Sequence, residues 1–307
     1  KHIFLSNFLS NSISDPHPTF FGWLAAFSVV AIWSGWVVVS RLGVSQTLTI
    51  YDIIILRFVV ASIAVSPFIF AHWPRQLPWW KVILLASGPG VPYLLFAFNG
   101  MQFAPASHAG ILMNGSLPIF AALIGWLWLG DKANNRTIVG LVIVFAGCVM
   151  IGFDRNSGGA SPDAWIGHLF FLSSALMLAT YMVATKLLEL APLEALVAIP
   201  IVNLAWFGPL YLAFLPSTIS DAPWAEILLQ GLYQGLGPSV LGVLFFTVAI
   251  RSIGPTPTAA VMAGVPGIAT LLAIPILGEW PSMLAWAGLV VVTVGILLAT
   301  LRQSVKQ

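Results

Sequence analysis

The chain has 307 residues, of which 59% are hydrophobic and only 7% are charged, with a formal net charge of +2. A soluble domain carries about 25% charged residues, so this composition excludes a soluble globular protein and predicts an integral membrane protein. The small net charge argues against a nucleic-acid partner, and the single cysteine, Cys148, excludes internal disulfides and cysteine-based metal sites.

Ten apolar runs follow a polar start to the chain. Residues 1–18 are predicted to form a flexible N-terminal arm. A membrane-spanning helix needs about 20 apolar residues, and the short loops leave no extramembrane domain for separate chemistry. The expected spans are 20–40, 53–72, 79–103, 105–129, 136–153, 164–189, 194–215, 224–250, 256–277 and 283–301.

The distribution of basic residues predicts which side of the membrane each loop faces. Arg41, Arg57 and Arg155 fall on the side opposite the chain ends, and the other lysines and arginines fall on the side of the chain ends. The positive-inside rule therefore predicts that both termini are cytoplasmic. Arg57 is ambiguous, because it lies about two turns into the second span.

The second half of the chain repeats the first. A shift of 148 residues (266 − 118) places Pro118 on Pro266 and Gly130-Asp131 on Gly278-Glu279. Near the start, a shift of 145 residues (186 − 41) places Arg41 on Lys186. Each half, 19–155 and 156–303, holds five spans, and an odd number predicts that the second half is inverted. Inverted repeats are typical of secondary transporters, which bind substrate near the midplane between the repeats.

Glycines also recur at corresponding positions and are expected to allow close helix packing. They are Gly140, Gly147, Gly288 and Gly295.

Helix breakers recur at corresponding positions of the third, fourth, eighth and ninth spans. Proline removes a backbone hydrogen bond, and in lipid the freed group must be satisfied by protein or by water in a cavity. We therefore expect these breaks to face the interior and to act as hinges, although ordinary kinks tolerated by packing are the alternative. The hinge candidates are Gly88, Pro89, Gly90, Pro118, Gly237, Pro238 and Pro266.

Aromatic and neutral polar residues within the spans are the candidates for a substrate site. Aromatic walls with a few hydrogen-bonding groups suit a small amphipathic solute. The alternative for each polar residue is a helix–helix hydrogen bond. The candidates are Trp33, Trp36, Tyr93, Asn99, Asn114, Ser174, Tyr181, Tyr233 and Gln234.

Charged residues are nearly confined to span ends and loops. This argues against a buried carboxylate relay, and we expect no midplane Lys or Arg to clamp a phosphorylated substrate. His108 opens the fourth span and is a possible proton site, or else it caps the helix or anchors it at the interface. His72 and His168 are expected at the interface. No metal or cofactor is expected.

The ten spans, the proline followed by a Gly-acid pair in the fourth and ninth spans, and the "GLVIV" and "GLVVV" segments resemble the EamA type of the drug/metabolite transporter superfamily over 20–301. Within it, "YLLFAFNGMQFAPASHAGILMNGSLPIF" is similar to the YddG-type amino-acid exporters, on Tyr93, His108, Asn114 and Pro118. The resemblance implies a cavity between spans 3, 4, 8 and 9, with parts of 1 and 6, in a bacterial inner-membrane protein.

These features together predict an all-helical exporter of small neutral amphipathic metabolites that works by alternating access. Amino acids with aromatic or apolar side chains are the expected substrates, membrane lipids surround the protein, and a monomer is expected to function. Movement is expected to be facilitated or weakly proton-coupled rather than tightly sodium-coupled. A sugar or nucleotide-sugar carrier is the first alternative. A membrane-embedded enzyme is the second, but the sequence offers no clear nucleophile–base–orienter set.

Overall fold

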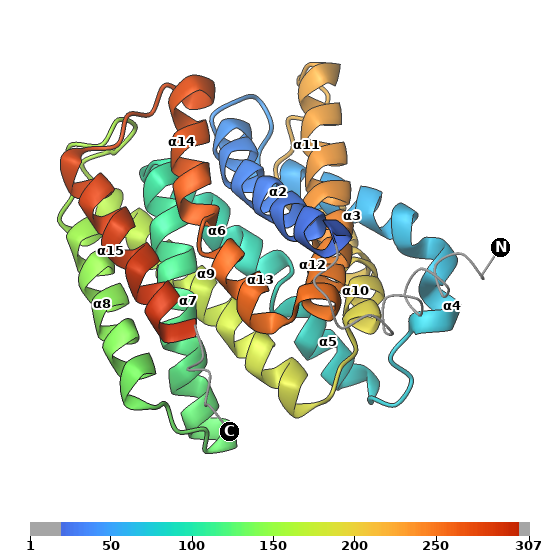
Figure 1. Cartoon of the computed structure of the whole chain (residues 1–307). Helices are drawn as coiled ribbons and strands as arrows, with labels where there is room; N and C mark the ends of the chain where they lie inside the picture. The colour runs from blue at the N-terminus through green and yellow to red at the C-terminus, as the bar shows by residue number, and fades with distance from the viewer. Residues whose placement is uncertain (1–19, 301–307) are drawn as a thin grey trace.

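The computed structural model of the chain describes residues 20–300, and all regular structure in that range is helical. Figure 1 shows the helices gathered in one bundle. The predicted arm, 1–18, lies outside the described residues. The elements are α2 (Phe20–Val44), α3 (Ile50–Val65), η2 (Ser66–Phe68), α4 (Ile69–His72), α5 (Trp79–Ser87), α6 (Val91–Phe103), α7 (Ala106–Leu129), α8 (Asn135–Gly152), α9 (Ala164–Leu187), α10 (Pro192–Phe214), α11 (Trp224–Leu236), η3 (Gly237–Leu241), α12 (Gly242–Ile253), α13 (Pro255–Met262), α14 (Val265–Leu277) and α15 (Met283–Thr300).

Within residues 20–300, 10 helical segments are long and apolar enough to span a membrane, which confirms the expected number. Some spans combine several elements. The second joins α3, η2 and α4, the third α5 and α6, the eighth α11, η3 and α12, and the ninth α13 and α14. The second span begins at Ile50, earlier than expected, because Thr49 and Asp52 form a capping box that starts α3.

Large apolar side chains cover the outside of the bundle. Phe70, Leu212 and Phe214 are 84%, 83% and 79% exposed. Water would solvate such a surface poorly, whereas lipid tails solvate it well. The exposed surface therefore agrees with a chain embedded in a membrane.

Helices α8 and α15, the last spans of the two halves, pack closely through glycines. A Cβ atom on Gly140 would lie 2.6 Å from the backbone nitrogen of Ala299, and one on Gly295 would lie 2.7 Å from the backbone nitrogen of Val144. Because neither backbone can retreat without separating the pair, a larger residue does not fit. The prediction that these glycines allow close packing is confirmed.

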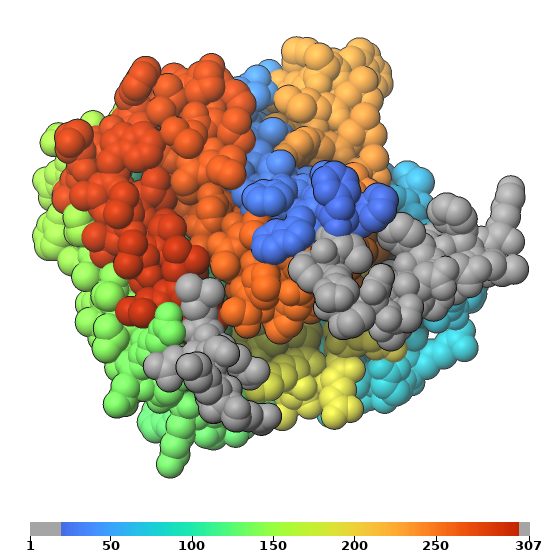
Figure 2. Space-filling view, in the orientation of Figure 1, coloured from blue at the N-terminus to red at the C-terminus, as the bar shows by residue number. Residues whose placement is uncertain are grey.

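The two halves of the chain are interlocked. Helix α2 packs against α12 and α14 of the second half, and α9 packs against α6 and α7 of the first half. In Figure 2, the blue surface of α2 lies between the orange-red surface of α14 and the gold surface of α11. The first helix of each half is thus held mainly by the other half.

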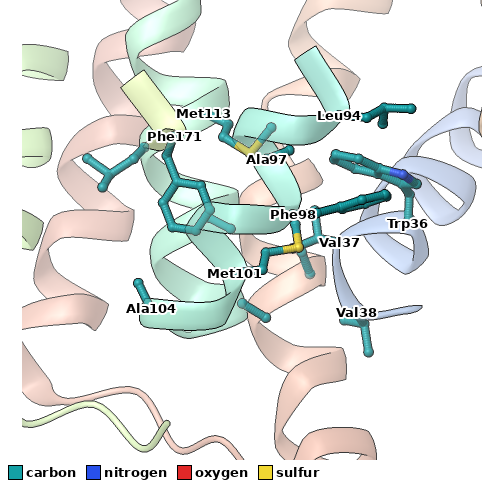
Figure 3. Packing of buried hydrophobic residues seen from close by; sticks show 14 of the residues in the cluster. Trp36, Val37, Val38, Leu94, Ala97, Phe98, Met101, Ala104, Met113 and Phe171 are labelled. Atoms are coloured by element: carbon teal, nitrogen blue, oxygen red, sulfur yellow. The ribbon is translucent and has the colours of Figure 1, made fainter. Parts of the chain in front are cut away.

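The apolar core lies where these helices meet. Figure 3 shows Trp36 and Val37 of α2 gathered with Phe98 and Met101 of α6. Phe171 of α9 belongs to the same cluster, and its ring occupies the space beside Gly100, where a Cβ atom would come within 2.6 Å of it. The core therefore joins α2, α6 and α9, and it fixes the position of the third span.

The expected helix breaks differ from one another. The third span is interrupted at residues 88–90, and the ninth at 263–264. The eighth stays continuous through the π-helical turn η3, which begins at Gly237. The expectation of a break at Pro118 is wrong, because α7 continues through it from Ala106 to Leu129. Its counterpart Pro266 lies in the first turn of α14, where its missing N–H costs no helical hydrogen bond.

Side chains from other spans satisfy the backbone at both interruptions. Asn203 of α10 donates to the carbonyl of Ala86 at 2.8 Å and accepts from the amide of Val91 at 2.9 Å, so it bridges the gap between α5 and α6. Ser34 of α2 donates to the carbonyl of Val265 at 3.1 Å, beside the gap between α13 and α14. Unpaired backbone groups in lipid are costly, and these contacts let the gaps persist.

The glycine contact between α8 and α15 gives a stability prediction. Gly140→Ala should lower the free energy of unfolding by about 1–3 kcal/mol through overpacking, measured as a fall in the thermal unfolding midpoint in detergent. Gly152→Ala is the matched control on α8, because no atom lies within 4 Å of its Cβ position. Equal effects of the two substitutions would contradict the packing argument.

Candidate functional site

Trp36 and Tyr93 form an aromatic pair between α2 and α6. Their ring centroids lie 6.0 Å apart with the planes inclined by 21°. The indole nitrogen of Trp36 is buried and has no hydrogen-bond partner. Ser174 of α9 donates to the backbone carbonyl of Tyr93 at 3.3 Å. Three of the predicted site residues therefore meet at one place.

Arg57 of α3 lies next to this pair, inside the bundle. Its Nη1 donates to Oε1 of Gln234 at 3.2 Å, its Nε is buried without a partner, and its charge lies within electrostatic range of the Tyr93 phenol. We expected no Lys or Arg near the midplane, and Arg57, about 10 Å from the start of α3, is a cation that lies inside the bundle. The sequence places Arg57 about two turns into the second span and leaves its side of the membrane ambiguous, because hydropathy does not show which way an arginine side chain turns.

A small cavity of about 70 Å³ lies beside Arg57. Phe58 of α3, Pro89 of the α5–α6 break, Pro200 of α10 and Ser239 of η3 contribute to its wall. This cavity involves the second and seventh spans, which were not expected to line the site. It does touch two of the predicted hinge segments, at Pro89 and next to Pro238.

Gln234 of α11 joins three helices. Its amide nitrogen donates to Oγ of Ser40 on α2 at 3.0 Å and to Oε1 of Gln230 at 3.3 Å, while its oxygen accepts from Arg57 of α3. Gln230 in turn donates to the carbonyl of Val39 at 2.9 Å. The predicted site residue Gln234 is therefore a buried connector between α2, α3 and α11.

Other predicted site residues are separated from this group. The Trp33 ring packs on Phe246 of α12, with centroids 5.4 Å apart. The hydroxyl of Tyr233 donates to the carbonyl of Ile32 at 3.0 Å. Tyr181 lines a different, smaller cavity between α5, α9 and α10.

Asn99 and Asn114 bond within their own helices. Asn99 donates to the carbonyl of Leu95 at 2.7 Å, and Asn114 donates to the carbonyl of Gly110 at 2.8 Å. Among the described residues, their amide oxygens accept no hydrogen bond, so each side chain still has an acceptor to offer.

A buried ion pair closes one end of the bundle, which we call the Arg41 end. Nε of Arg41 lies 2.6 Å from Oε1 of Glu279, and the same guanidinium donates to the carbonyls of Met101 and, at 3.2 Å, Gly159. Oε2 of Glu279 accepts from the backbone amide of Ala106 at 2.7 Å. Arg41 and Glu279 therefore tie together α2, α6, α7, the α8–α9 loop and the end of α14.

Two further buried acids tie other loops at the same end. Asp52 accepts hydrogen bonds from the hydroxyls of Tyr211 at 2.6 Å and Ser217 at 2.7 Å. Glu226 accepts from the backbone amide of Leu48 at 2.8 Å. These contacts fasten the start of α3 to the end of α10 and the α10–α11 loop, and the α2–α3 loop to the start of α11. The acids do lie at span ends, as expected, but they are buried within protein.

His108, His168 and Asp154 form a third buried cluster at the Arg41 end. Nε2 of His108 lies 3.0 Å from Oδ2 of Asp154, and its Nδ1 lies 3.0 Å from Nε2 of His168. His108 is fully buried and His168 is 7% exposed. The expectation that His168 is interfacial is therefore wrong, as is the alternative that His108 anchors at the interface, because packing of α7 against α9 buries both rings together.

Asp154 is held as a charged carboxylate. Burial alone would raise the pKa of Asp154, but hydrogen bonds from His108, Ser157, Ser282 and the backbone amide of Asn156 outweigh burial and hold the pKa well below its usual range. Because the carboxylate accepts a hydrogen bond from Nε2 of His108, Nδ1 of that ring is placed to accept a hydrogen bond from Nε2 of His168.

The opposite end of the bundle, the Lys186 end, is held more loosely. Nζ of Lys186 lies 2.7 Å from Oδ2 of Asp131, but the two side chains are 66% and 57% exposed. Gln76 donates to Glu194 at 2.8 Å, again near the surface. Helix α9 runs from the Arg41 end to the Lys186 end, and its 24 residues span about 36 Å at roughly 1.5 Å per residue.

The two ion pairs occupy equivalent sequence positions. Under the shifts found in the sequence, Arg41 corresponds to Lys186 and Asp131 to Glu279. In the structure, each base pairs with the acid of the other half, Arg41 with Glu279 and Lys186 with Asp131. The repeat therefore places one cross-half ion pair at each end of the bundle, buried at one end and exposed at the other.

Comparison with known proteins gives relatives over most of the chain. A probable terminal-alkyne amino-acid exporter from Streptantibioticus cattleyicolor is 26% identical over 80% of this chain and 82% of that protein. An uncharacterized transporter from Archaeoglobus fulgidus is 25% identical over 89% of this chain and 94% of that protein.

A crystal structure of another protein shares the fold, with a TM-score of 0.64 at 19% identity over 91% of this chain and 96% of that chain. The model of the EamA-like transporter family matches twice, at residues 20–153 and 165–301. The chain is therefore a membrane transporter that belongs to the EamA-like transporter family.

Proposed function

We propose that the protein exports small neutral amphipathic metabolites, chiefly amino acids with aromatic or apolar side chains, by alternating access. It acts as a monomeric carrier in a bacterial inner membrane, without a cofactor and without catalysing a reaction. Both chain ends lie in the cytoplasm, so the Arg41 end faces outward. In the described state, the buried Arg41–Glu279 contacts then close the outer end, and the exposed Lys186–Asp131 pair holds the inner end.

The observation that carries this proposal is the pair of ion pairs at equivalent positions. We infer that halves 19–155 and 156–303 insert with opposite orientation. If each half then adopts the conformation that the other half has now, the closed end of the bundle becomes the open end and the open end becomes the closed end. The contacts that now bury Arg41 and Glu279 would then form around Lys186 and Asp131, and the outer end would open. The double match to the family model supports two related halves, and odd-numbered repeats support the inversion.

The substrate class rests on the Trp36–Tyr93 pair and on a relative. Stacked aromatic rings inside the bundle provide a wall for an aromatic or apolar side chain. The Streptantibioticus relative is described as a probable exporter of an amino acid. The group around Arg57 and Gln234 adds hydrogen-bonding partners at the same place.

A radiolabelled amino-acid panel tests the function. Liposomes containing the purified protein should take up aromatic and apolar amino acids down their gradient without sodium, and unlabelled sugars should not compete. Tyr93→Ala and Asn114→Ala should raise the half-saturating concentration roughly 3- to 10-fold, the loss expected for one aromatic contact or hydrogen bond. The lipid-exposed Trp165→Ala is the control. Wild-type uptake by both variants, a strict sodium requirement or competition by sugars would each contradict the proposal.

The buried ion pair gives a test of alternating access. Arg41→Gln leaves Glu279 buried without its cation. This should destabilise the state that is closed at the outer end by about 3–5 kcal/mol. A cysteine at Val38, which is fully buried on α2, should then react with a membrane-impermeant thiol reagent at least tenfold faster than in the parent. The matched change Lys186→Gln at the other end should not accelerate this labelling. Equal labelling in both backgrounds would argue against ends that alternate.

His108 gives a prediction about proton coupling. If the His108–His168 pair carries the coupled proton, an imposed pH gradient should stimulate wild-type uptake in liposomes. His108→Gln should remove the stimulation but keep movement down a substrate gradient. His72→Gln serves as the control, because His72 lies at the other end of the bundle. A full pH-gradient response in His108→Gln would exclude this histidine as the proton site.

A further inference from the structure

Arg57 is a cation placed deep within a membrane span. It lies about 10 Å from the start of α3, at roughly 1.5 Å per residue from Ile50. A cation removed from water is costly unless an anion pairs with it, and an ionisable residue within a span marks a functional site until its partner is identified. The question is which anion pairs with Arg57.

The described residues provide no anion for Arg57. The ion pairs in residues 20–300 involve Arg41, His108 and Lys186, each with a carboxylate at one end of the bundle. The hydrogen-bonded partner of Arg57 is the neutral amide of Gln234. Ser239 and Tyr93, the other polar groups near it, are also neutral.

The side of the guanidinium that has no hydrogen-bond partner has a defined geometry. Nη1 is used by Gln234, whereas Nε is buried and unpartnered. The Nε–Nη2 edge is therefore the free edge of the fork. This edge presents two parallel N–H groups, which match the two oxygens of a carboxylate.

The cavity beside Arg57 has room for such a group. At about 70 Å³ it exceeds what one water molecule requires. Its remaining wall includes Phe58, Pro89 and Ile199, which are apolar and have no side-chain group that could pair with Arg57 in place of a bound anion. Tyr93, which stacks on Trp36, lies within electrostatic range of the guanidinium, so this aromatic pair is near enough to contact an apolar body attached to a carboxylate at Arg57.

We propose that Arg57 binds the carboxylate of the transported molecule through its Nε–Nη2 edge, so that the substrates are monocarboxylates with an aromatic or apolar body. This inference rests on the proposed export function and specifies how that site recognises its substrate. A single arginine among neutral groups balances one negative charge, which disfavours the dianionic phosphate of a nucleotide sugar or sugar phosphate. The same surroundings hold no described acid for an ammonium group, so the amine contributes less to binding than the carboxylate.

Substrate analogues test the chemistry directly. Competition against a labelled aromatic amino acid in liposomes should be strong for its N-acetyl derivative, which keeps the carboxylate. It should be at least tenfold weaker for its methyl ester or amide, which lack the negative charge. Equal competition by the ester and the free acid would overturn the inference.

Substitutions at Arg57 test the residue. Arg57→Gln should raise the half-saturating concentration for the free acid at least tenfold and abolish the preference for the acid over the ester. Arg57→Lys should keep part of that preference, because lysine retains the charge but lacks the fork. The exposed Arg75→Gln is the matched control. An acid-over-ester preference in Arg57→Gln equal to wild type would overturn the inference.

Thermal unfolding separates a binding role from a structural one. Removing an uncompensated buried charge should leave the unfolding midpoint of Arg57→Gln unchanged or raise it, whereas loss of a structural contact would lower it. Free acid should raise the midpoint of the wild type but not of Arg57→Gln. A lowered midpoint with the ligand-induced rise retained would overturn the inference.

The outcomes distinguish this inference from the proposed function. Wild-type uptake of amino acids without dependence on Arg57 would leave the export function intact and remove the carboxylate site. If the wild type takes up no amino acid, the export proposal fails. In that case, a rise in the unfolding midpoint with an aromatic monocarboxylate such as phenylacetate that requires Arg57 would still support the carboxylate site. The absence of such a rise would overturn the inference.

Discussion

The hydrocarbon core of a membrane contains no water to satisfy a polar group, and this constraint explains where polar side chains lie in the structure. Asn203 is buried in α10 because its amide bridges the two sides of the α5–α6 interruption. Ser34 has the corresponding role beside the α13–α14 interruption. The interruptions of the third and ninth spans can therefore persist inside the bundle without unpaired backbone groups, as the proposed bending of these spans requires.

The same constraint makes the two ends of the bundle unequal. At the Arg41 end, Glu279 and Asp154 are buried with nearly all of their oxygens hydrogen-bonded, so opening this end requires these bonds to be replaced by water. At the Lys186 end, the ion pair is largely exposed, and exposed pairs contribute only about 0–1 kcal/mol. If the protein works by alternating access as proposed, the described structure corresponds to the state that is sealed at the Arg41 end. Exchange between states requires the second end to acquire comparable burial when the first loses it.

The ten spans, the duplication and the glycine contacts of α8 with α15 could be predicted from sequence, because span length and small-residue packing are local properties. The environment of Arg57, the burial of His168 and the continuity of α7 through Pro118 could not. Each depends on which side of a helix faces a neighbour, and the spans are too uniformly apolar for periodicity to show it. Of the predicted site residues, Trp36, Tyr93, Ser174 and Gln234 are brought together around α2 and α6, whereas Trp33 and Tyr181 face other contacts.

The position of Arg57 connects recognition to movement. Its cavity is bounded by Pro89 of the α5–α6 interruption and by Ser239 of the π-helical turn, the irregular segments of the third and eighth spans. A π turn replaces i→i+4 hydrogen bonds with i→i+5 bonds, and such turns occur frequently at functional sites. A carboxylate bound at Arg57 would neutralise the buried cation beside the irregular segments of both spans. Binding would then lower the free energy of any arrangement that encloses the ion pair, so the substrate itself would favour the change of state that carries it across.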